Sequence, residues 1–350
     1  MRSNKEKIEK EYIMETLKIS NDVFCGNIDC FKNLIDIYNF CGNSKNNILD
    51  LSEIKEVNPF NMLVIALALK ECKNKFGNIE CYIPNNENTD KYMQYMGFYE
   101  TCDAPVRDVA KGNRRQGRYI CITKISLESQ GSIESDYDMI EQEAKKLAEM
   151  IQFDKELGEY VKYCFFEMIR NVYEHADTND VYVCAQYWPN HNLIEIAIAD
   201  KGCGIQKAMS KRYKDLPEDV LMKYAMTPGL SALSNHAYLE KDDYYKNSGY
   251  GLYMTKELAL AYEGSFIICS GNYARRYYCY QYSLVEKEHK TKFNGTAIAI
   301  RFSTDKTPNF RSVLEKIKNK AESKSKSIKG AIKKASKSSG GDYGKVKNAE

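Results

Sequence analysis

The sequence is poor in the residues that build zinc sites, disulfide frameworks and membrane spans. Its 350 residues include 4 histidines, 7 prolines and 1 tryptophan. The 12 cysteines are scattered, and none lies three positions from another, as paired zinc ligands commonly do. The longest uninterrupted apolar run, residues 62–69, is far shorter than the ~20 residues of a membrane helix. The composition therefore argues against a zinc protein, a disulfide-rich scaffold and a membrane span.

Two further features concern location and charge. The first residues are charged and lack an apolar signal region, and the thiols are scattered, so we expect a cytoplasmic protein with reduced cysteines. Residues 306–350 carry 13 Lys and Arg against 4 Asp and Glu, whereas the whole chain carries 51 against 48. The composition of this end predicts a disordered basic tail. Such a tail could contact nucleic-acid or anionic-lipid phosphates, although a solvated tail is the commoner role.

Five segments follow from the patterning. Residues 1–17 form a charged, helix-prone arm, and residues 18–105 alternate strand and helix at the spacing of a small α/β domain with parallel strands. Residues 106–132 are a polar linker followed by a strand. Residues 133–305 predict an α+β two-layer sandwich, with helices on one face of a mainly antiparallel sheet. Residues 306–350 are the basic tail.

The individual elements expected within these segments can be given by residue range. The helices are 59–74, 91–96, 137–151, 156–175 and 252–262. The strands are 47–54, 79–83, 118–125, 181–188, 193–200, 265–270, 277–285 and 296–302. Residues 207–248 are polar and are expected to be mobile.

The first chemical motif lies on the helix 156–175. Glu167, Asn171 and His175 are spaced four residues apart and therefore project from one helix face. An amide oxygen one turn from a carboxylate can ligate Mg²⁺ while the carboxylate orients or deprotonates a nucleophile. A solvated polar face is the simpler reading, but apolar residues surround these three positions.

The second motif follows the apolar strand 193–200. Asp200 stands at the strand end, where its carboxylate can accept a hydrogen bond from the amino group of adenine. Gly202 and Gly204, followed by Ile205, would let the backbone pass close to a ligand. Alone the pattern is weak, because an Asp-Gly turn after a strand is common.

The third and fourth motifs are glycine-containing turns. Gly249 and Gly251, with Leu252, open a helix whose unpaired N–H groups and positive dipole end suit phosphate. An ordinary loop before a helix is the alternative. Thr296 follows Gly295 at the start of the last strand and could place a hydroxyl nearby.

In this order the four motifs resemble the N, G1, G2 and G3 boxes of the GHKL superfamily of ATP-binding domains (gyrase, chaperone, histidine kinase, MutL). The phrase RNVYEHA is most similar to the anti-sigma-factor serine kinase branch. The resemblance implies ATP and Mg²⁺ as ligands, Asn171 as the metal ligand, Glu167 as the catalytic base and Asp200 as the adenine partner. His175, the motif glycines, Ile205, Leu252 and Thr296 would complete the nucleotide site. Lys201 and Val172 depart from the family pattern at positions that are not ligands.

Residues 18–102 resemble a STAS-type domain, the fold of anti-sigma-factor antagonists. Members of that family carry a phosphorylated serine at the start of a helix, but residues 57–61 of this chain (VNPFN) have no hydroxyl. The resemblance therefore implies a sensor, a dimerising element or a docking surface rather than a substrate in cis.

Two functional classes remain open. The first is a serine/threonine protein kinase of anti-sigma type, or a slow ATPase, acting on an external protein such as a STAS-domain or sigma-factor-like regulator. The second is an ATP-gated switch that controls a protein or nucleic-acid partner. An orthodox histidine kinase is disfavoured, because no histidine precedes His175 to serve as phosphoacceptor. The sequence leaves a homodimer open.

Overall fold

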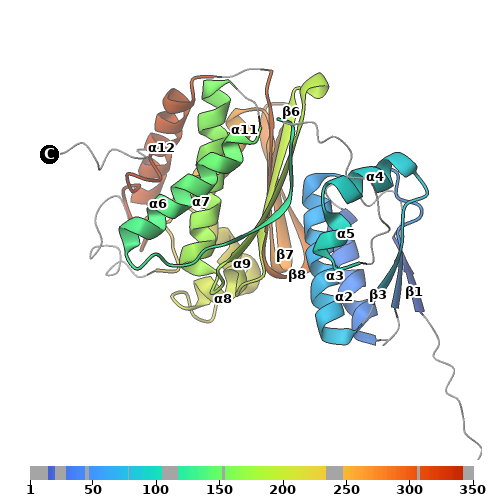
Figure 1. The fold of residues 1–350 in the computed structure, drawn as a ribbon. Coiled ribbons are helices and arrows are strands. Elements are labelled where there is room, and N and C mark those ends of the chain that lie inside the picture. Colours follow the sequence, from blue (N-terminus) through green and yellow to red (C-terminus); the bar gives the residue numbers. More distant parts are fainter. Residues whose placement is uncertain are drawn as a thin grey trace, which may run out of the picture.

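The protein is built from two sheets with helices between and beside them. The computed structural model describes residues 15–19, 29–43, 47–77, 79–104, 117–151, 154–233, 247–305 and 308–341. Three strands form a parallel sheet, and five form an antiparallel sheet in the order β4-β5-β6-β8-β7. Figure 1 shows the resulting succession of a helical layer, the five-stranded sheet, a second helical layer and the three-stranded sheet.

The amino-terminal unit contains the parallel sheet. Its elements are β1 (Glu15–Lys18), α2 (Asp29–Asn43), β2 (Asn47–Asp50), α3 (Pro59–Phe76), β3 (Ile79–Tyr82), α4 (Glu87–Tyr95) and α5 (Phe98–Thr101). Helix α3 begins where Asn58 accepts the Asn61 N–H and ends at Gly77. The charged arm expected over 1–17 is wrong in its last residues, since they pair in β1. Residues 1–14 and the linker residues 105–116 lie outside the described residues.

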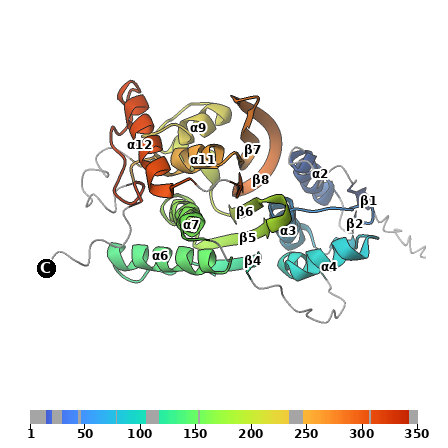
Figure 2. The ribbon, with the colours of Figure 1, turned by 90° about the horizontal axis from the view of Figure 1, so that it is seen from above.

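The second unit contains the antiparallel sheet. Its elements are β4 (Tyr119–Ser126), α6 (Ile133–Glu149), α7 (Lys155–His175), β5 (Asp180–Trp188), the 3₁₀ turn η1 (Pro189–His191), β6 (Leu193–Asp200), α8 (Gly204–Ser210), α9 (Glu218–Ala225), α11 (Gly251–Ala261), β7 (Ser265–Tyr280), β8 (Ser283–Ser303) and α12 (Phe310–Lys326). Figure 2 shows α6, α7, α11 and α12 on one side of the sheet and α2 and α3 on the other.

Residue size explains why helices cover both faces of the antiparallel sheet. On β6 and β8, isoleucines face α7 and α11, whereas alanines face α2 and α3. The small side chains let α3 approach closely, and α3 itself is apolar on every side because both sheets cover it. One of the two core clusters, between the sheets, therefore contains residues of both predicted domains.

Polar contacts fix the start of α3 against the antiparallel sheet. The Phe60 N–H donates to the buried carboxylate of Glu195 over 3.0 Å, and Arg301 donates to the same carboxylate from the other side over 2.8 Å. The Cys184 thiol lies 3.3 Å from the carbonyl oxygen of Pro59. The start of α3 is thus buried in an internal interface.

Three expectations about the second unit are wrong. The strand predicted over 277–285 is instead a hairpin, because Gln281 and Tyr282 adopt the positive φ angles of a tight turn between β7 and β8. The polar stretch 207–248, expected to be mobile, contains α9 and most of α8, both packed on the core; residues 234–246 lie outside the described residues. Much of the basic tail, expected to be disordered, forms α12 and a packed segment after it.

Helix α12 is ordered because one of its faces is apolar. Phe310, Leu314, Ile317 and Ala321 recur at helical spacing and pack into the core formed by α7 and α11. The prediction of disorder rested on the high lysine content of this end and did not take this apolar stripe into account. None of the helices in the described residues is long and apolar enough to span a membrane.

Candidate functional site

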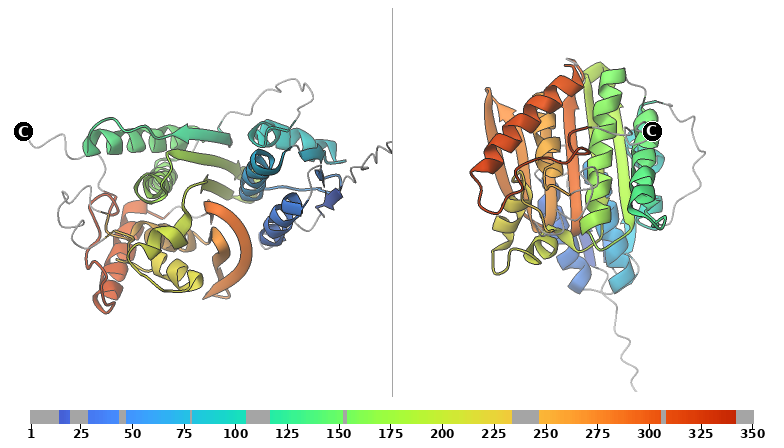
Figure 3. Two further views of the ribbon diagram at one scale, coloured as in Figure 1. Left: turned by 90° about the horizontal axis from the view of Figure 1, so that it is seen from below. Right: turned by 90° about the vertical axis from the view of Figure 1, so that its left-hand side faces the viewer.

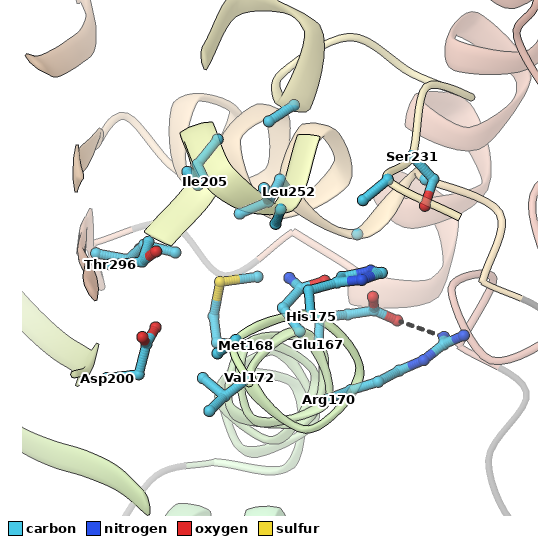
Figure 4. Close-up of a pocket in the computed structure, with 18 of the residues that line it drawn as sticks. Glu167, Met168, Arg170, Val172, His175, Asp200, Ile205, Ser231, Leu252 and Thr296 are labelled. Atoms are coloured by element: carbon cyan, nitrogen blue, oxygen red, sulfur yellow. Dashed lines mark ion pairs between the residues drawn. The ribbon is translucent and has the colours of Figure 1, made fainter. Parts of the chain in front are cut away.

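A pocket opens between α7, the carboxyl end of β6 and the start of α11. It holds about 900 Å³ of empty space, its open mouth included. Ten of the eleven residues singled out from the sequence line it: Glu167, Asn171, His175, Asp200, Gly204, Ile205, Gly249, Gly251, Leu252 and Thr296. Figure 4 shows Asp200 and Thr296 on one side and Glu167, His175 and Arg170 on the other.

Glu167 is a buried carboxylate with an incomplete set of hydrogen bonds. It projects from the middle of α7 with 2% of its surface exposed, and Oε1 has no hydrogen-bond partner among the described residues. The nearest cation, Nη1 of Arg170, lies 3.9 Å from Oε1. Burial raises the pKa of Glu167 to about 7, although Arg170 opposes the shift. A carboxyl with a pKa near neutrality can accept a proton from a substrate group under physiological conditions.

Asn171 lies one helical turn beyond Glu167. Its amide nitrogen is also buried and has no hydrogen-bond partner among the described residues. Gly251, the first residue of α11, faces both side chains: a Cβ built on it would lie 2.2 Å from Oε2 of Glu167 and 3.8 Å from Nδ2 of Asn171. The absence of a side chain at Gly251 thus brings the amino-terminal end of α11 against this polar pair.

Asp200 forms the opposite end of the pocket. Its carboxylate is 3% exposed and accepts the Gly202 N–H over 2.8 Å. Burial raises the pKa of Asp200 to about 6, with backbone N–H groups of Gly202 and Thr296 opposing the shift. Thr296 is the partner of Asp200 in the β6–β8 register, which explains their proximity. Met168, Val172, Ile198, Ile205 and Met209 are among the apolar residues that line the pocket.

Gly202 is the one predicted site residue that does not line the pocket. A Cβ at this position would lie 2.0 Å from the carbonyl oxygen of Ala176, so the glycine allows the loop to pass the end of α7. Gly249 has a similar constraint, because φ is +70° and a Cβ would meet the Leu230 carbonyl oxygen at 2.4 Å. Nε2 of His175 lies 2.6 Å from the side-chain amide nitrogen of Asn247, which places His175 at the pocket wall.

A buried ionic network beside Glu167 was not predicted from the sequence. Arg170 donates from Nε to Glu174 over 3.1 Å and from Nη1 to the Ser338 hydroxyl over 2.8 Å. Burial works against ionisation of Glu174, but Arg170 and His175 outweigh it and lower its pKa. The i, i+4 spacing of Arg170 and Glu174 was available in the sequence. Nothing local in the sequence indicated that Ser338 and Ser339 reach this site.

Lys201, which follows Asp200, is not among the residues that line the pocket. Its ammonium lies 2.5 Å from Oε2 of Glu71 on α3 and 4.4 Å from the centre of the Phe293 ring. Burial lowers the pKa of Lys201, and Glu71 opposes that shift. The lysine therefore connects the Asp200 loop to the amino-terminal unit.

The described residues contain no group of three or more His, Cys, Asp and Glu side chains arranged to hold a metal ion.

Neither the protein-family models nor the curated proteins compared with this chain match it.

Proposed function

We propose that this chain binds Mg-ATP in the pocket between Asp200 and Glu167, as a GHKL-type domain, and transfers the γ-phosphate to a hydroxyl group or to water. The observation that carries the proposal is a pair of buried polar atoms, Oε1 of Glu167 and Nδ2 of Asn171, that have no hydrogen-bond partner among the described residues and belong to side chains beside the start of α11. Burying a polar atom without a partner is costly, so such atoms at a pocket wall indicate a missing ligand.

The adenine would bind at the Asp200 end of the pocket. A buried carboxylate held by the Gly202 N–H can accept from the exocyclic amine, and Thr296 adds a hydroxyl beside it. The apolar lining, which includes Val172 and Ile205, suits the faces of a planar base.

The phosphates would bind at the Glu167 end of the pocket. Asn171 would hold Mg²⁺ through its amide oxygen, with the phosphates supplying further ligands. The first turn of the 11-residue helix α11 offers N–H groups and a positive dipole end to the phosphate chain. Glu167, with its pKa near neutrality, would accept the proton of the attacking hydroxyl or water.

Calorimetric titration with a non-hydrolysable ATP analogue and Mg²⁺ tests both assignments. Asn171→Ala is expected to lose Mg²⁺-dependent affinity, whereas Glu167→Gln keeps affinity and loses turnover. Asn319→Ala, on the exposed face of α12, serves as the matched control and should bind as the unmodified protein does. Unchanged affinity in Asn171→Ala would refute the metal assignment.

An ATP-gated switch is the second candidate function. The pocket is lined by α8, by Leu230 and Ser231 and by Ser339 of the carboxyl-terminal segment, so a bound nucleotide would contact three separate parts of the chain. For a kinase acting in trans, the acceptor would belong to another protein such as a STAS-domain or sigma-factor-like regulator. The buried start of α3 cannot serve as that acceptor.

A further inference from the structure

The segment after α12 returns across the protein and ends beside Glu167. Figure 3 shows the chain leaving α12 and running back toward α7. The Ile332 N–H donates to the Gly229 carbonyl over 2.7 Å, and the Ser336 N–H donates to the Ser248 hydroxyl over 3.0 Å. These contacts dock residues 332–339 on the loops that flank the pocket.

Three serines of this segment are buried: Ser336, Ser338 and Ser339. They have different partners. Ser336 bonds to Ser248 and to its two serine neighbours, and Ser338 accepts from Arg170. Only Ser339 has a hydrogen bond to Glu167, with Oγ 3.5 Å from Oε2.

The backbone holds Ser339 in this place. Its carbonyl oxygen accepts the hydroxyl hydrogen of the buried Tyr163 over 3.0 Å, and its N–H donates to Ser336 Oγ over 3.3 Å. Ser339 also lines the pocket, beside Glu167. A hydroxyl that contacts the base and faces the pocket occupies the position a nucleophile needs.

We propose that Ser339 is the phosphoacceptor of this site in cis, so that the protein phosphorylates its own carboxyl-terminal segment. The inference rests on the proposed function, because it takes ATP as the phosphate donor. In the transfer, Oγ of Ser339 forms a bond to the γ-phosphorus. The bond from that phosphorus to the β–γ bridging oxygen breaks, and its electron pair leaves with ADP. The proton of the Ser339 hydroxyl passes to Glu167, which later releases it to solvent.

The product is unstable in the docked position. A phosphoserine carries close to two negative charges, and here it would lie beside Glu167 in a buried environment. Arg170 is near, but it is already paired with Glu174. Phosphorylation is therefore expected to release the segment from α7 and uncover the pocket.

The test incubates the full chain with Mg²⁺ and γ-labelled ATP and maps the label by peptide mass spectrometry. The label is expected on Ser339, to be lost in Ser339→Ala and in Glu167→Gln, and to persist in Ser327→Ala, an exposed serine at the end of α12 whose hydroxyl bonds to the Lys324 carbonyl. Labelling per molecule should not change on tenfold dilution of the protein, since the acceptor is in cis. A label that maps to another residue, or that survives Ser339→Ala, would overturn the proposal.

Two measurements separate this inference from the proposed function. If the chain fails to bind the ATP analogue, the proposed function is wrong and the inference falls with it. If the chain binds ATP and releases phosphate only to water, the inference alone is wrong.

A measurement without nucleotide tests the docking itself. Lys337 lies between the buried Ser336 and Ser338, so trypsin should cleave after Lys337 slowly in the full chain. Cleavage should become fast in Ser339→Glu, which introduces a carboxylate against Glu167. Ready cleavage in the unmodified chain would show that the hydroxyl is not held at Glu167 and would contradict the proposal.

Discussion

Alanine at Gly251 should damage catalysis far more than stability. The φ angle of Gly251 is not positive, so alanine introduces no backbone strain, and helix propensity favours alanine by up to about 1 kcal/mol. The new Cβ would lie 2.2 Å from Oε2 of Glu167. The obstacle is the end of a side chain, which must retreat by roughly 1 Å to reach ordinary contact. Overpacking of this kind costs ~1–3 kcal/mol, so the net loss in the free energy of unfolding should be about 0–2 kcal/mol.

The effect on turnover should be larger because Glu167 is the proposed base. A displacement of about 1 Å at a catalytic group lowers rates roughly 100-fold. Steady-state ATP turnover and urea unfolding of Gly251→Ala measure the two effects. Turnover equal to that of the unmodified chain would refute the placement of Glu167 in the reaction.

Gly202→Ala provides the matched comparison. Its Cβ would lie 2.0 Å from the backbone oxygen of Ala176, and a backbone atom cannot rotate away. The end of α7 must then move, so a loss of about 3 kcal/mol in the free energy of unfolding is expected. Equal stability of Gly202→Ala and the unmodified chain would contradict the close approach seen here.

Three further predictions concern charge. Burial raises the pKa of Asp200 from 3.8 to about 6, so the folded protein retains a proton that the unfolded chain releases. The stability from this group is present at low pH and is lost, by about 3 kcal/mol, as pH rises through about 4 to 6. In urea titrations Asp200→Asn should remove this part of the pH dependence and leave the part that comes from Glu167, whose pKa is raised to about 7. GTP should compete for the ATP site about 5- to 150-fold less well than ATP. The reason is that Asp200 would face a guanine carbonyl, which leaves two acceptors unpaired at a cost of ~1–3 kcal/mol. Equal displacement of labelled ATP by both nucleotides would disprove the adenine assignment. Lys201→Met should lower the free energy of unfolding by about 1 kcal/mol, because Glu71 loses one of its two lysine partners and keeps Lys75. A double-mutant cycle with Glu71→Gln measures the interaction, and additive losses would show that the two side chains do not interact.

Local periodicity predicted α6, α7 and α11 of the second unit and most of its strands, but not α8, α9 or α12. The helix expected over 156–175 is α7, and the strand expected over 193–200 is β6. The face shared by Glu167, Asn171 and His175 follows from helical geometry alone, and all three line the pocket. The β7–β8 turn was not predicted, because Gln281 and Tyr282 are not the residues that usually adopt positive φ.

The sequence by itself determined which residues share a helix face and which loops carry glycine, since both depend on neighbours within a few positions. Tertiary structure alone decided what those residues meet. Ser339 lies 172 positions from Glu167, and Glu195 contacts the Phe60 N–H across 135 positions. Contacts at such separations depend on how whole elements pack, and no local pattern encodes them. Ser339 is held against Glu167 because the carboxyl-terminal segment folds back onto α7.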